Sequence, residues 1–439
     1  MNGRTVIALI TLLLLLLAEQ LTYGLFYSDL SFITASFFPD MDKKKLGYYA
    51  GYIMSSFYLG QLPGCLFWGW IADRYGRRKP LLVVVLLDSI FVFVFAFIRN
   101  YYVAVVLRFV WGFCDGHYAL IKTLVADYSD SRTIARNSSF LFLSVSIGNS
   151  ISPLLGGYLS NPHNLSPWLL NHFPILLKKQ FCFPFIVCGS LLALCFIAVY
   201  LWVVETPRKD ALLPEEEKPK QSYTSLLCDK NVLITILLYG IEALCQVSYD
   251  SLTSLWLSSS RADGGMNWSV MDIGWFMCFV CPMQMGNLVV FPIMSQALSV
   301  TVTYTTISSL QAILLFLTPF VTLLPNQICL IVFLYIATSF FHLFRTILFK
   351  YPLTRRHESF TSFRAQENRA KSYGLSQMLG GMGRFIGPPT LTSLFAWSIS
   401  SSHPYPFNYA LSYCILSLLS LVAVLASLGL SKSVNTSRV

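Results

Sequence analysis

The sequence is poor in charged residues. Only 12% of its 439 residues are charged and 55% are hydrophobic, with a mean hydropathy of +0.60, whereas a soluble globular protein carries about 25% charged residues. This shortage excludes an ordinary soluble protein and predicts an integral membrane protein. The net charge of +10 does not indicate a nucleic-acid partner, because the basic residues gather in short loops between apolar runs.

The sequence also lacks the patterns of several enzyme and cofactor classes. It contains no G-x-x-x-x-G-K-[ST] loop, so we do not expect ATP-driven activity. No set of nucleophile, base and orienting group stands out, which argues against an enzyme. The eleven cysteines are scattered, and several lie inside apolar segments, as Cys188 and Cys195 do, which is typical of small packing residues. We therefore predict no cofactor and no metal site.

Long apolar runs are what the sequence has in abundance. A membrane-spanning helix needs about 20 mostly apolar residues, and spans are helical because the bilayer offers backbone groups no other partner. Twelve segments meet this requirement, namely 6–28, 47–71, 80–98, 101–126, 137–160, 182–204, 231–257, 270–297, 302–323, 327–350, 372–398 and 405–429. The first could be a signal peptide. We interpret it as a span, because the apolar run continues through Phe26 and the number of spans is even only if it is kept.

The middle of the chain is polar, charged and proline-bearing from Glu205 to Ser225. This segment separates the twelve spans into two sets of six. The predicted fold is an all-α membrane protein with twelve transmembrane helices in two pseudo-symmetric bundles, residues 1–204 and 231–439, joined by a cytosolic central loop, 205–230. Most Lys and Arg residues lie on the side of the membrane that holds both termini, which predicts that both termini are cytosolic.

Two predicted spans contain matching helix breaks. Span five reads GNSISPLLGG and span eleven reads GRFIGPPT, with the shared pattern G-x-x-I-[SG]-P. The residues of this repeated motif are Gly148, Ser152, Pro153, Gly156, Gly157, Gly383, Gly387 and Pro388. Glycine lets helices approach closely, and proline bends a helix. Breaks at matching places in two halves point to the central site of a transporter, although two ordinary helix-packing motifs would give the same letters.

The loop after span two reads GWIADRYGRRKP and resembles motif A of the major facilitator superfamily. Its polar elements are all present: Gly69, Asp73, Arg74, Gly76, Arg77 and Arg78. The resemblance implies twelve spans and secondary transport. We expect the glycines to permit a tight turn at the membrane surface, and Asp73 to pair with a basic residue in one conformation. The second half has no copy of this motif.

Further resemblances are more specific. Residues 148–157 resemble the antiporter signature of the superfamily, with Ser152 where glycine is usual, and Arg108 with Gly112 resembles motif B, an intramembrane arginine linked to proton transfer. GYYAGYIMSSFYLG and GHYALIKTLVADYSD are similar to the zinc-induced facilitator-like group, close to tetracycline-resistance-like drug:proton antiporters. Plant members of the group carry a histidine between spans eight and nine. SQALSVT has none here, so zinc is not indicated as substrate.

Ionisable residues inside spans cost about 2.5–3.5 kcal/mol each and are expected to face the bundle interior. We predict a proton or substrate path made of Glu19, Arg108, Asp115, Lys122, Glu242, Asp250 and Arg384. Arg108, Asp115 and Lys122 are spaced to share one helix face, as a path or as a static network. His117 lies off that face and is interpreted as structural. Glu19 is the first choice for the coupling acid, followed by Asp115 and Glu242, and Arg384 is expected to be a counter-charge.

These patterns predict a monomeric secondary transporter that moves a small organic or drug-like solute by alternating access, with protons as the coupled partner and antiport as the leading mode. Proton symport or facilitated uptake of a small organic anion is the alternative within this class. A membrane receptor or scaffold that keeps the fold without transport is the alternative from another class. A plasma membrane and a vacuolar or lysosomal membrane both fit.

Overall fold

The computed structural model describes residues 3–130, 133–161, 164–165, 167–173, 176, 181–205, 230–279, 282, 286, 300–323, 331–334, 336–337, 363–400 and 403–429. Every regular element in these residues is helical. The α-helices are α1 (Gly3–Ser28), α2 (Leu30–Phe37), α3 (Gly47–Tyr75), α4 (Arg78–Phe97), α5 (Tyr101–Cys114), α6 (His117–Asp127), α7 (Ile134–Leu159), α8 (Pro167–His172), α10 (Cys182–Trp202), α12 (Lys230–Ser258), α14 (Val300–Leu317), α16 (Phe363–Ser400) and α17 (Leu411–Leu428). Short 3-10 helices are η1 (Lys43–Lys45), η5 (Arg261–Asp263) and η6 (Thr318–Leu323).

The predicted fold class is confirmed. Within the described residues, 8 helical segments are long and apolar enough to cross a membrane, and a shorter apolar helix covers Val270–Phe279. The predicted spans 47–71 and 372–398 correspond to α3 and α16, which are longer but more polar. Most of the predicted span 270–297 beyond residue 279, and most of the predicted span 327–350, lie outside the described residues. So does almost all of the predicted loop 205–230. The count of twelve is consistent with this arrangement.

Two predicted spans differ from the helices observed. The predicted span 101–126 is interrupted at Asp115 and Gly116, which separate α5 from α6. The predicted span 405–429 begins late, because residues 405–410 form turns before α17 starts at Leu411. Prolines at 404 and 406 explain the late start, since proline cannot donate a helical hydrogen bond.

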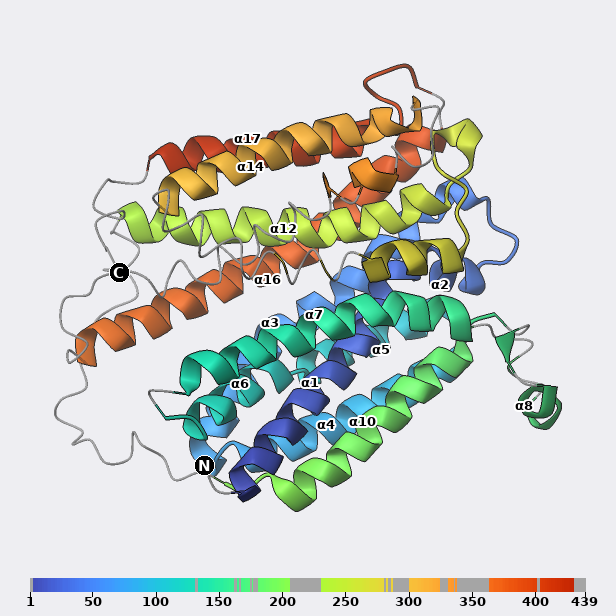
Figure 1. Cartoon of the computed structure of the whole chain (residues 1–439). Coiled ribbons are helices and arrows are strands. Elements are labelled where there is room, and N and C mark those ends of the chain that lie inside the picture. Colours follow the sequence, from blue (N-terminus) through green and yellow to red (C-terminus); the bar gives the residue numbers. More distant parts are fainter. Residues whose placement is uncertain are drawn as a thin grey trace.

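The first residues of α1 and the last residues of α17 lie at the same end of the molecule (Figure 1).

The glycine–proline motifs of spans five and eleven lie inside the continuous helices α7 and α16, so the predicted helix breaks are not found. The two motifs instead form the same helix contact twice. A Cβ added to Gly148 of α7 would lie 2.9 Å from the Leu17 carbonyl oxygen of α1. A Cβ added to Gly383 of α16 would lie 2.6 Å from the Gly240 carbonyl oxygen of α12. Glycine is required at both places because the neighbouring backbone already occupies the space of a side chain.

The next helical turn repeats the contact in both halves. The Ser152 hydroxyl of α7 donates to the Leu21 carbonyl oxygen of α1, and a Cβ on Gly387 of α16 would lie 2.9 Å from the Leu244 carbonyl oxygen of α12. α1 and α12 are therefore equivalent partners of α7 and α16. In the same register, Glu19 of α1 corresponds to Glu242 of α12, and Asn149 of α7 corresponds to Arg384 of α16.

The two halves meet closely at the end remote from the start of α1. A Cβ on Gly47 of α3 would lie 2.6 Å from the Thr392 carbonyl oxygen of α16, and one on Gly274 would lie 2.7 Å from the Pro153 carbonyl oxygen of α7. Beyond these contacts, the Lys44 ammonium lies 2.7 Å from Asp263 Oδ1, which joins the segment before α3 to the segment after α12. We call these contacts the closed end.

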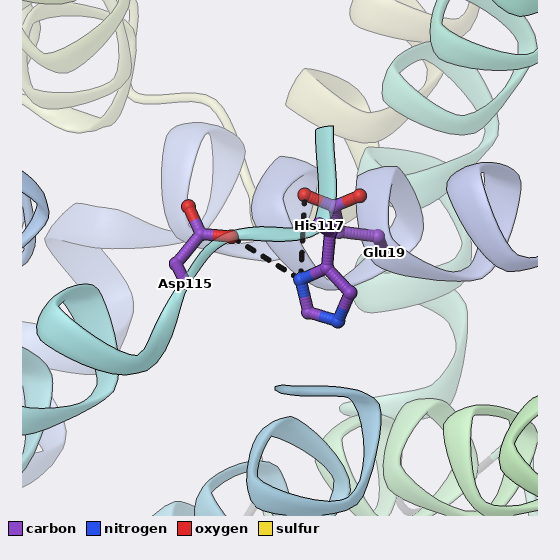
Figure 2. Close-up of side chains that lie close together, drawn as sticks. All are labelled: Glu19, Asp115 and His117. Atoms are coloured by element: carbon purple, nitrogen blue, oxygen red, sulfur yellow. Dashed lines mark hydrogen bonds and ion pairs between the residues drawn. The ribbon is translucent and has the colours of Figure 1, made fainter. Parts of the chain in front are cut away.

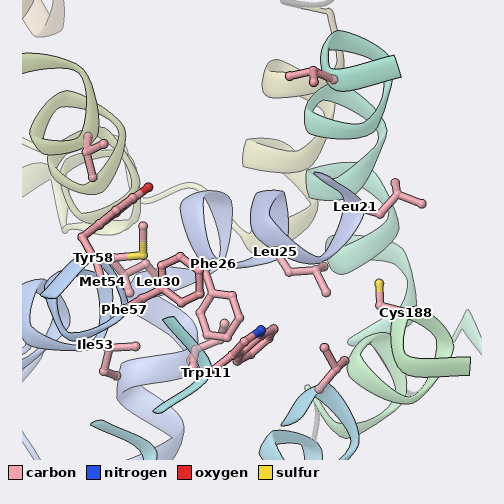
Figure 3. Close-up of a cluster of buried hydrophobic side chains, with 14 of the residues drawn as sticks. Leu21, Leu25, Phe26, Leu30, Ile53, Met54, Phe57, Tyr58, Trp111 and Cys188 are labelled. Carbon is pink, nitrogen blue, oxygen red and sulfur yellow. The ribbon is translucent and has the colours of Figure 1, made fainter. Parts of the chain in front are cut away.

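An aromatic core fills the N-terminal half. Phe26 of α1 lies with its ring centroid 4.9 Å from that of Phe95 and 5.8 Å from that of Trp111, both edge to face. Figure 3 shows Phe26, Phe57 and Trp111 among aliphatic neighbours from α1 and α3. Such edge-to-face ring pairs add to the stabilisation that burial alone gives, and they hold α1, α3, α4 and α5 in fixed relation around the site described next.

Candidate functional site

The break in the fourth predicted span creates the centre of the site. α5 ends at Cys114, Asp115 is extended with φ −77° and ψ 109°, and α6 begins at His117. Because the chain is not helical at Asp115 and Gly116, the seven-residue spacing does not place Arg108, Asp115 and Lys122 on one face. The predicted stripe of alternating charge is therefore wrong.

Three carboxylates surround one histidine at this break. His117 Nδ1 lies 3.1 Å from Asp88 Oδ2, 3.2 Å from Asp115 Oδ1 and 3.9 Å from Glu19 Oε1. Figure 2 shows Asp115 and Glu19 converging on the same ring nitrogen from different parts of the chain. All four residues are at least 95% buried. We call Glu19, Asp88, Asp115 and His117 the carboxylate–histidine cluster.

Neighbouring donors satisfy two of the three carboxylates. Asp115 Oδ2 accepts hydrogen bonds from the Tyr23 hydroxyl at 2.7 Å and from Gln61 Nε2 at 2.6 Å. Asp88 Oδ1 accepts from Trp111 Nε1 at 2.9 Å. Among the described residues, Glu19 Oε2 and His117 Nε2 are buried with no hydrogen-bond partner. Glu19 is thus the carboxylate with a free place for a proton.

Two residues of this site, Asp88 and Gln61, were not predicted from the sequence, and a third, His117, was wrongly excluded. Asp88 and Gln61 were not among the candidates, although each is a polar residue inside a predicted span. His117 was set aside because of its angle from Arg108 and Asp115, an argument that fails once the helix is broken. The residue that sequence reasoning placed first, Glu19, lies within this cluster.

The cluster also contains a possible metal-ligand set. Glu19, Asp115 and His117 could each offer one ligand atom, since these atoms lie within 4.8 Å of one another. Their donor types, two carboxylates and one imidazole, suit several divalent cations. The prediction of no metal site remains a prediction.

Arg108 is held by aromatic rings. Its guanidinium carbon lies 3.8 Å from the ring centroid of Phe26, 4.4 Å from that of Phe57 and 4.9 Å from that of Trp111. The side chain is 1% exposed, and no ion pair within the described part of the chain includes it. Cation–π contacts with these rings therefore stabilise the Arg108 charge.

Arg384 lies on α16, in the C-terminal half. Its Nη2 donates to the Tyr239 hydroxyl of α12 at 3.0 Å, and its guanidinium carbon lies 6.0 Å from the ring centroid of Tyr58 on α3. The hydroxyl groups of Tyr58 and Tyr27 are hydrogen-bonded to each other. Arg384 therefore connects the two halves through tyrosines.

The remaining candidates are dispersed. Glu242 is buried on α12, and its Oε1 has no hydrogen-bond partner among the described residues. Asp250 is half-buried on α12, and Lys122 is half-buried on α6. None of these three forms an ion pair with the carboxylate–histidine cluster in the part of the chain that the structure describes.

The loop that resembles motif A forms the expected tight turn. Gly76 links α3 to α4 with a positive φ of 87°, a conformation that favours glycine. Glu205 accepts hydrogen bonds from the backbone N–H groups of Arg77 at 2.7 Å and Arg78 at 3.0 Å. The Arg77 side chain forms an ion pair with Asp127 of α6.

The other residues of that loop contribute less to the turn. Asp73 and Arg74 are exposed near the end of α3, and no ion pair among the described residues includes Asp73 in this conformation. Gly69 lies in the interior of α3, where an added Cβ would meet nothing within 4 Å. The acids that hold the turn here are Asp127 and Glu205.

The described residues form a helical bundle with matching glycine-mediated contacts in its two halves and with ionisable residues buried inside it. This arrangement is typical of a multi-pass membrane transporter. The sequence model of the Major Facilitator Superfamily matches residues 8–388. The chain belongs to this family, so it is a transporter of small solutes, as the resemblance predicted.

Relatives and solved structures agree with this assignment. A probable peptide/nitrate transporter of Arabidopsis thaliana is 23% identical over 84% of this chain and 78% of its own length. The protein ZINC INDUCED FACILITATOR-LIKE 1 of the same plant is 27% identical over 62% of this chain and 60% of its own length. A D-xylose-proton symporter of known structure has a TM-score of 0.76 at 15% identity and covers 99% of both chains. The last comparison shows the shared fold.

Proposed function

We propose that this protein is a monomeric, proton-coupled antiporter that exchanges a small organic solute for protons. The observation that carries the proposal is the carboxylate–histidine cluster, in which three buried acids face one imidazole nitrogen. Three carboxylates in a water-poor interior repel one another, so binding of protons there is favoured over full ionisation. A site that must hold protons, and that can exchange them, is what proton coupling requires.

The cluster can hold at least two protons at defined atoms. One proton on His117 Nδ1 is donated toward Asp88 or Asp115, both at hydrogen-bond distance. A second proton can bind Glu19 Oε2, which has no hydrogen-bond partner among the described residues. Loss of the second proton places a new negative charge on α1, next to the negative charges of Asp88 and Asp115.

A charge change on α1 can bias the position of the two halves. α1 contacts α12 of the other half as well as α7 of its own. A proton that changes how firmly α1 is held to α4 and α6 therefore also changes the contacts of α1 across the molecule, which is the differential interaction that a two-state equilibrium requires. Rocking of the halves would open the closed end and close the opposite end.

We further propose that both termini are cytosolic, because of the distribution of basic residues. In that orientation the closed end faces away from the cytosol. The conformation described here is then closed toward the non-cytosolic side, and protons reach the cluster from that side after the closed end opens.

Transport in proteoliposomes tests the proposal. Purified protein is reconstituted with a pH-sensitive dye inside the vesicles, and a panel of labelled organic solutes is offered with and without a pH gradient. Antiport predicts that solute accumulates inside the vesicles when the proton gradient is directed outward. The dye should then report protons leaving the vesicles as solute enters. Movement of solute and protons in the same direction would replace antiport by symport. Proton-independent transport in every condition would remove coupling altogether.

The alternative is symport or facilitated uptake of a small organic anion. Arg384 lies inside the bundle and is in no ion pair among the described residues, which favours an anionic cargo. The same vesicle assay separates the alternative, because symport of an anion is stimulated by an inward gradient of protons.

A further inference from the structure

Arg384 is a permanent charge that is in no ion pair with an acid among the described residues. Arginine stays protonated at all physiological pH values, and a charge inside the bundle of a membrane protein is costly without a counter-charge. No ion pair within the described residues includes Arg384. Glu242, one turn from Tyr239 along α12, is not within ion-pair distance of it. What Arg384 has instead is one hydrogen bond, to the Tyr239 hydroxyl.

The surroundings of Arg384 combine charge with flat apolar surfaces. Tyr239 is on α12, Tyr58 on α3 and Tyr27 on α1, so the three phenol groups come from both halves. Arg384 itself is only half-buried. A guanidinium with several free N–H donors, bordered by aromatic rings, matches the chemistry of a planar organic acid, because the fork of N–H groups binds carboxylate, sulfate or phosphate oxygens in pairs.

Arg108, the other intramembrane arginine, does not offer such a site. It is 1% exposed, and three rings stand within 5 Å of its guanidinium carbon. Its Nε lies 3.5 Å from the Ile53 carbonyl oxygen. The space that a ligand would need is already filled by side chains, so Arg108 is a packed structural cation.

We propose that Arg384 binds the anionic group of the transported solute, and that Tyr239, Tyr58 and Tyr27 bind its flat body. The substrate class is thus an organic anion with an aromatic or similarly planar part. The proposal rests on the proposed transport function and specifies its substrate. Because Arg384 contacts tyrosines of both halves, a bound anion strengthens the contact of α16 and α12 with α3 and favours closure of the halves around it.

Ligand binding to the purified full-length protein in detergent tests the proposal without any gradient. Thermal unfolding is followed with a thiol-reactive dye, which reports the exposure of buried cysteines. The anionic probes are benzoate, 2-naphthoate, 2-naphthalenesulfonate and 2-naphthyl phosphate. The matched probes are 2-naphthol, which is neutral, and 2-naphthylmethylamine, which is a cation. We expect saturable stabilisation by anions and little or none by the matched probes.

Variants show whether Arg384 is responsible. Arg384→Gln should weaken the apparent affinity for the stabilising anions by at least about tenfold, and Arg384→Lys should retain part of it because the charge is kept. Tyr239→Phe should have a smaller effect, since it removes one hydroxyl. Arg99→Gln, which removes an exposed loop arginine, is the control for loss of charge and should bind like the wild type.

Three outcomes overturn the proposal: equal stabilisation by neutral or cationic probes, equal binding of the anions to Arg384→Gln, and absence of stabilisation by every anion. These outcomes are independent of proton coupling. Anion binding in a protein that shows no coupling in vesicles would contradict the antiport mechanism and leave this inference intact. Coupled transport of cations alone would do the reverse.

Discussion

The two halves of the molecule share a backbone contact and differ in the chemistry placed beside it. In the N-terminal half, Glu19 lies between Leu17 and Leu21, the residues through which α1 contacts α7, and it faces a histidine and two further acids. In the C-terminal half, the equivalent Glu242 is buried and forms no such cluster among the described residues, whereas Arg384 stands where Asn149 does in the first. A repeated scaffold has thus been given an acidic site in one half and a basic site in the other. The difference suggests separate places for protons and solute.

The largest expected effect comes from removing Glu19, the acid of the N-terminal half. Glu19→Gln should lower solute accumulation driven by a pH gradient by roughly tenfold or more, because glutamine keeps the shape but cannot exchange a proton. Exchange of labelled for unlabelled solute without a gradient should persist. Glu242→Gln should have a clearly smaller effect. Equal loss in the two variants, measured in the same vesicles, would mean that the halves are not specialised.

The second prediction makes the C-terminal half resemble the N-terminal half. Arg384→Asn introduces the residue found at the equivalent position 149 and removes the intramembrane charge. We expect solute transport to be lost or directed to other solutes, with a decrease of at least about tenfold for anionic solutes. The protein should still express and elute as a folded species, since no ion pair within the described residues depends on Arg384. Unchanged kinetics in a well-expressed variant would reduce Arg384 to a structural residue.

The third prediction tests the repeated contact itself. Gly383→Val and Gly148→Val should each lower the free energy of unfolding by about 1–3 kcal/mol, because a side chain at either place overlaps the backbone of the neighbouring helix. Gly69→Ala is the matched control inside a helix. It meets no neighbour and should be neutral or slightly stabilising. Thermal unfolding in one detergent measures all three, and a neutral result for both valine variants would contradict the close packing.

The smallest expected effect concerns the ion pair at the closed end. Burial would raise the pKa of Asp263, but hydrogen bonds from Lys44 and Ser260 outweigh it and hold that pKa below its usual value. Ionised Asp263 therefore stabilises the closed end at any pH above about 4, and the stabilisation disappears as pH falls through the lowered pKa. Lys44→Gln should speed hydrogen exchange of residues 43–51 by roughly two- to fivefold at pH 7.

Two comparisons check this last effect. Lys43→Gln removes a neighbouring exposed lysine and should leave exchange as in the wild type. Wild-type exchange, corrected for its intrinsic pH dependence, should stay constant between pH 5 and pH 8 and accelerate only at lower pH. Acceleration near pH 6 instead would assign the closed end to a different titrating group.

The fold was predictable because it depends on features written in local sequence. Apolar runs define the spans, and the repeated G-x-x-I-[SG]-P pattern correctly located two equivalent helix contacts. The candidate site was less predictable, because it depends on a departure from helical geometry at Asp115 and Gly116. A helical-wheel argument cannot anticipate such a break, so it placed Arg108 with Asp115 and excluded His117. Asp88 was missed because a single acid in an apolar run has no partner visible in sequence.

The interruption between α5 and α6 has an electrostatic consequence beyond the positions of side chains. A helix end carries roughly half an elementary charge, positive at its amino terminus and negative at its carboxyl terminus. Because α5 ends at Cys114 and α6 begins at His117, the negative end of one helix and the positive end of the other both lie next to Asp115, in the low-dielectric interior. A continuous helix would cancel this field. The backbone thus places two opposite partial charges beside the carboxylate–histidine cluster, and they stay there in every protonation state of its members.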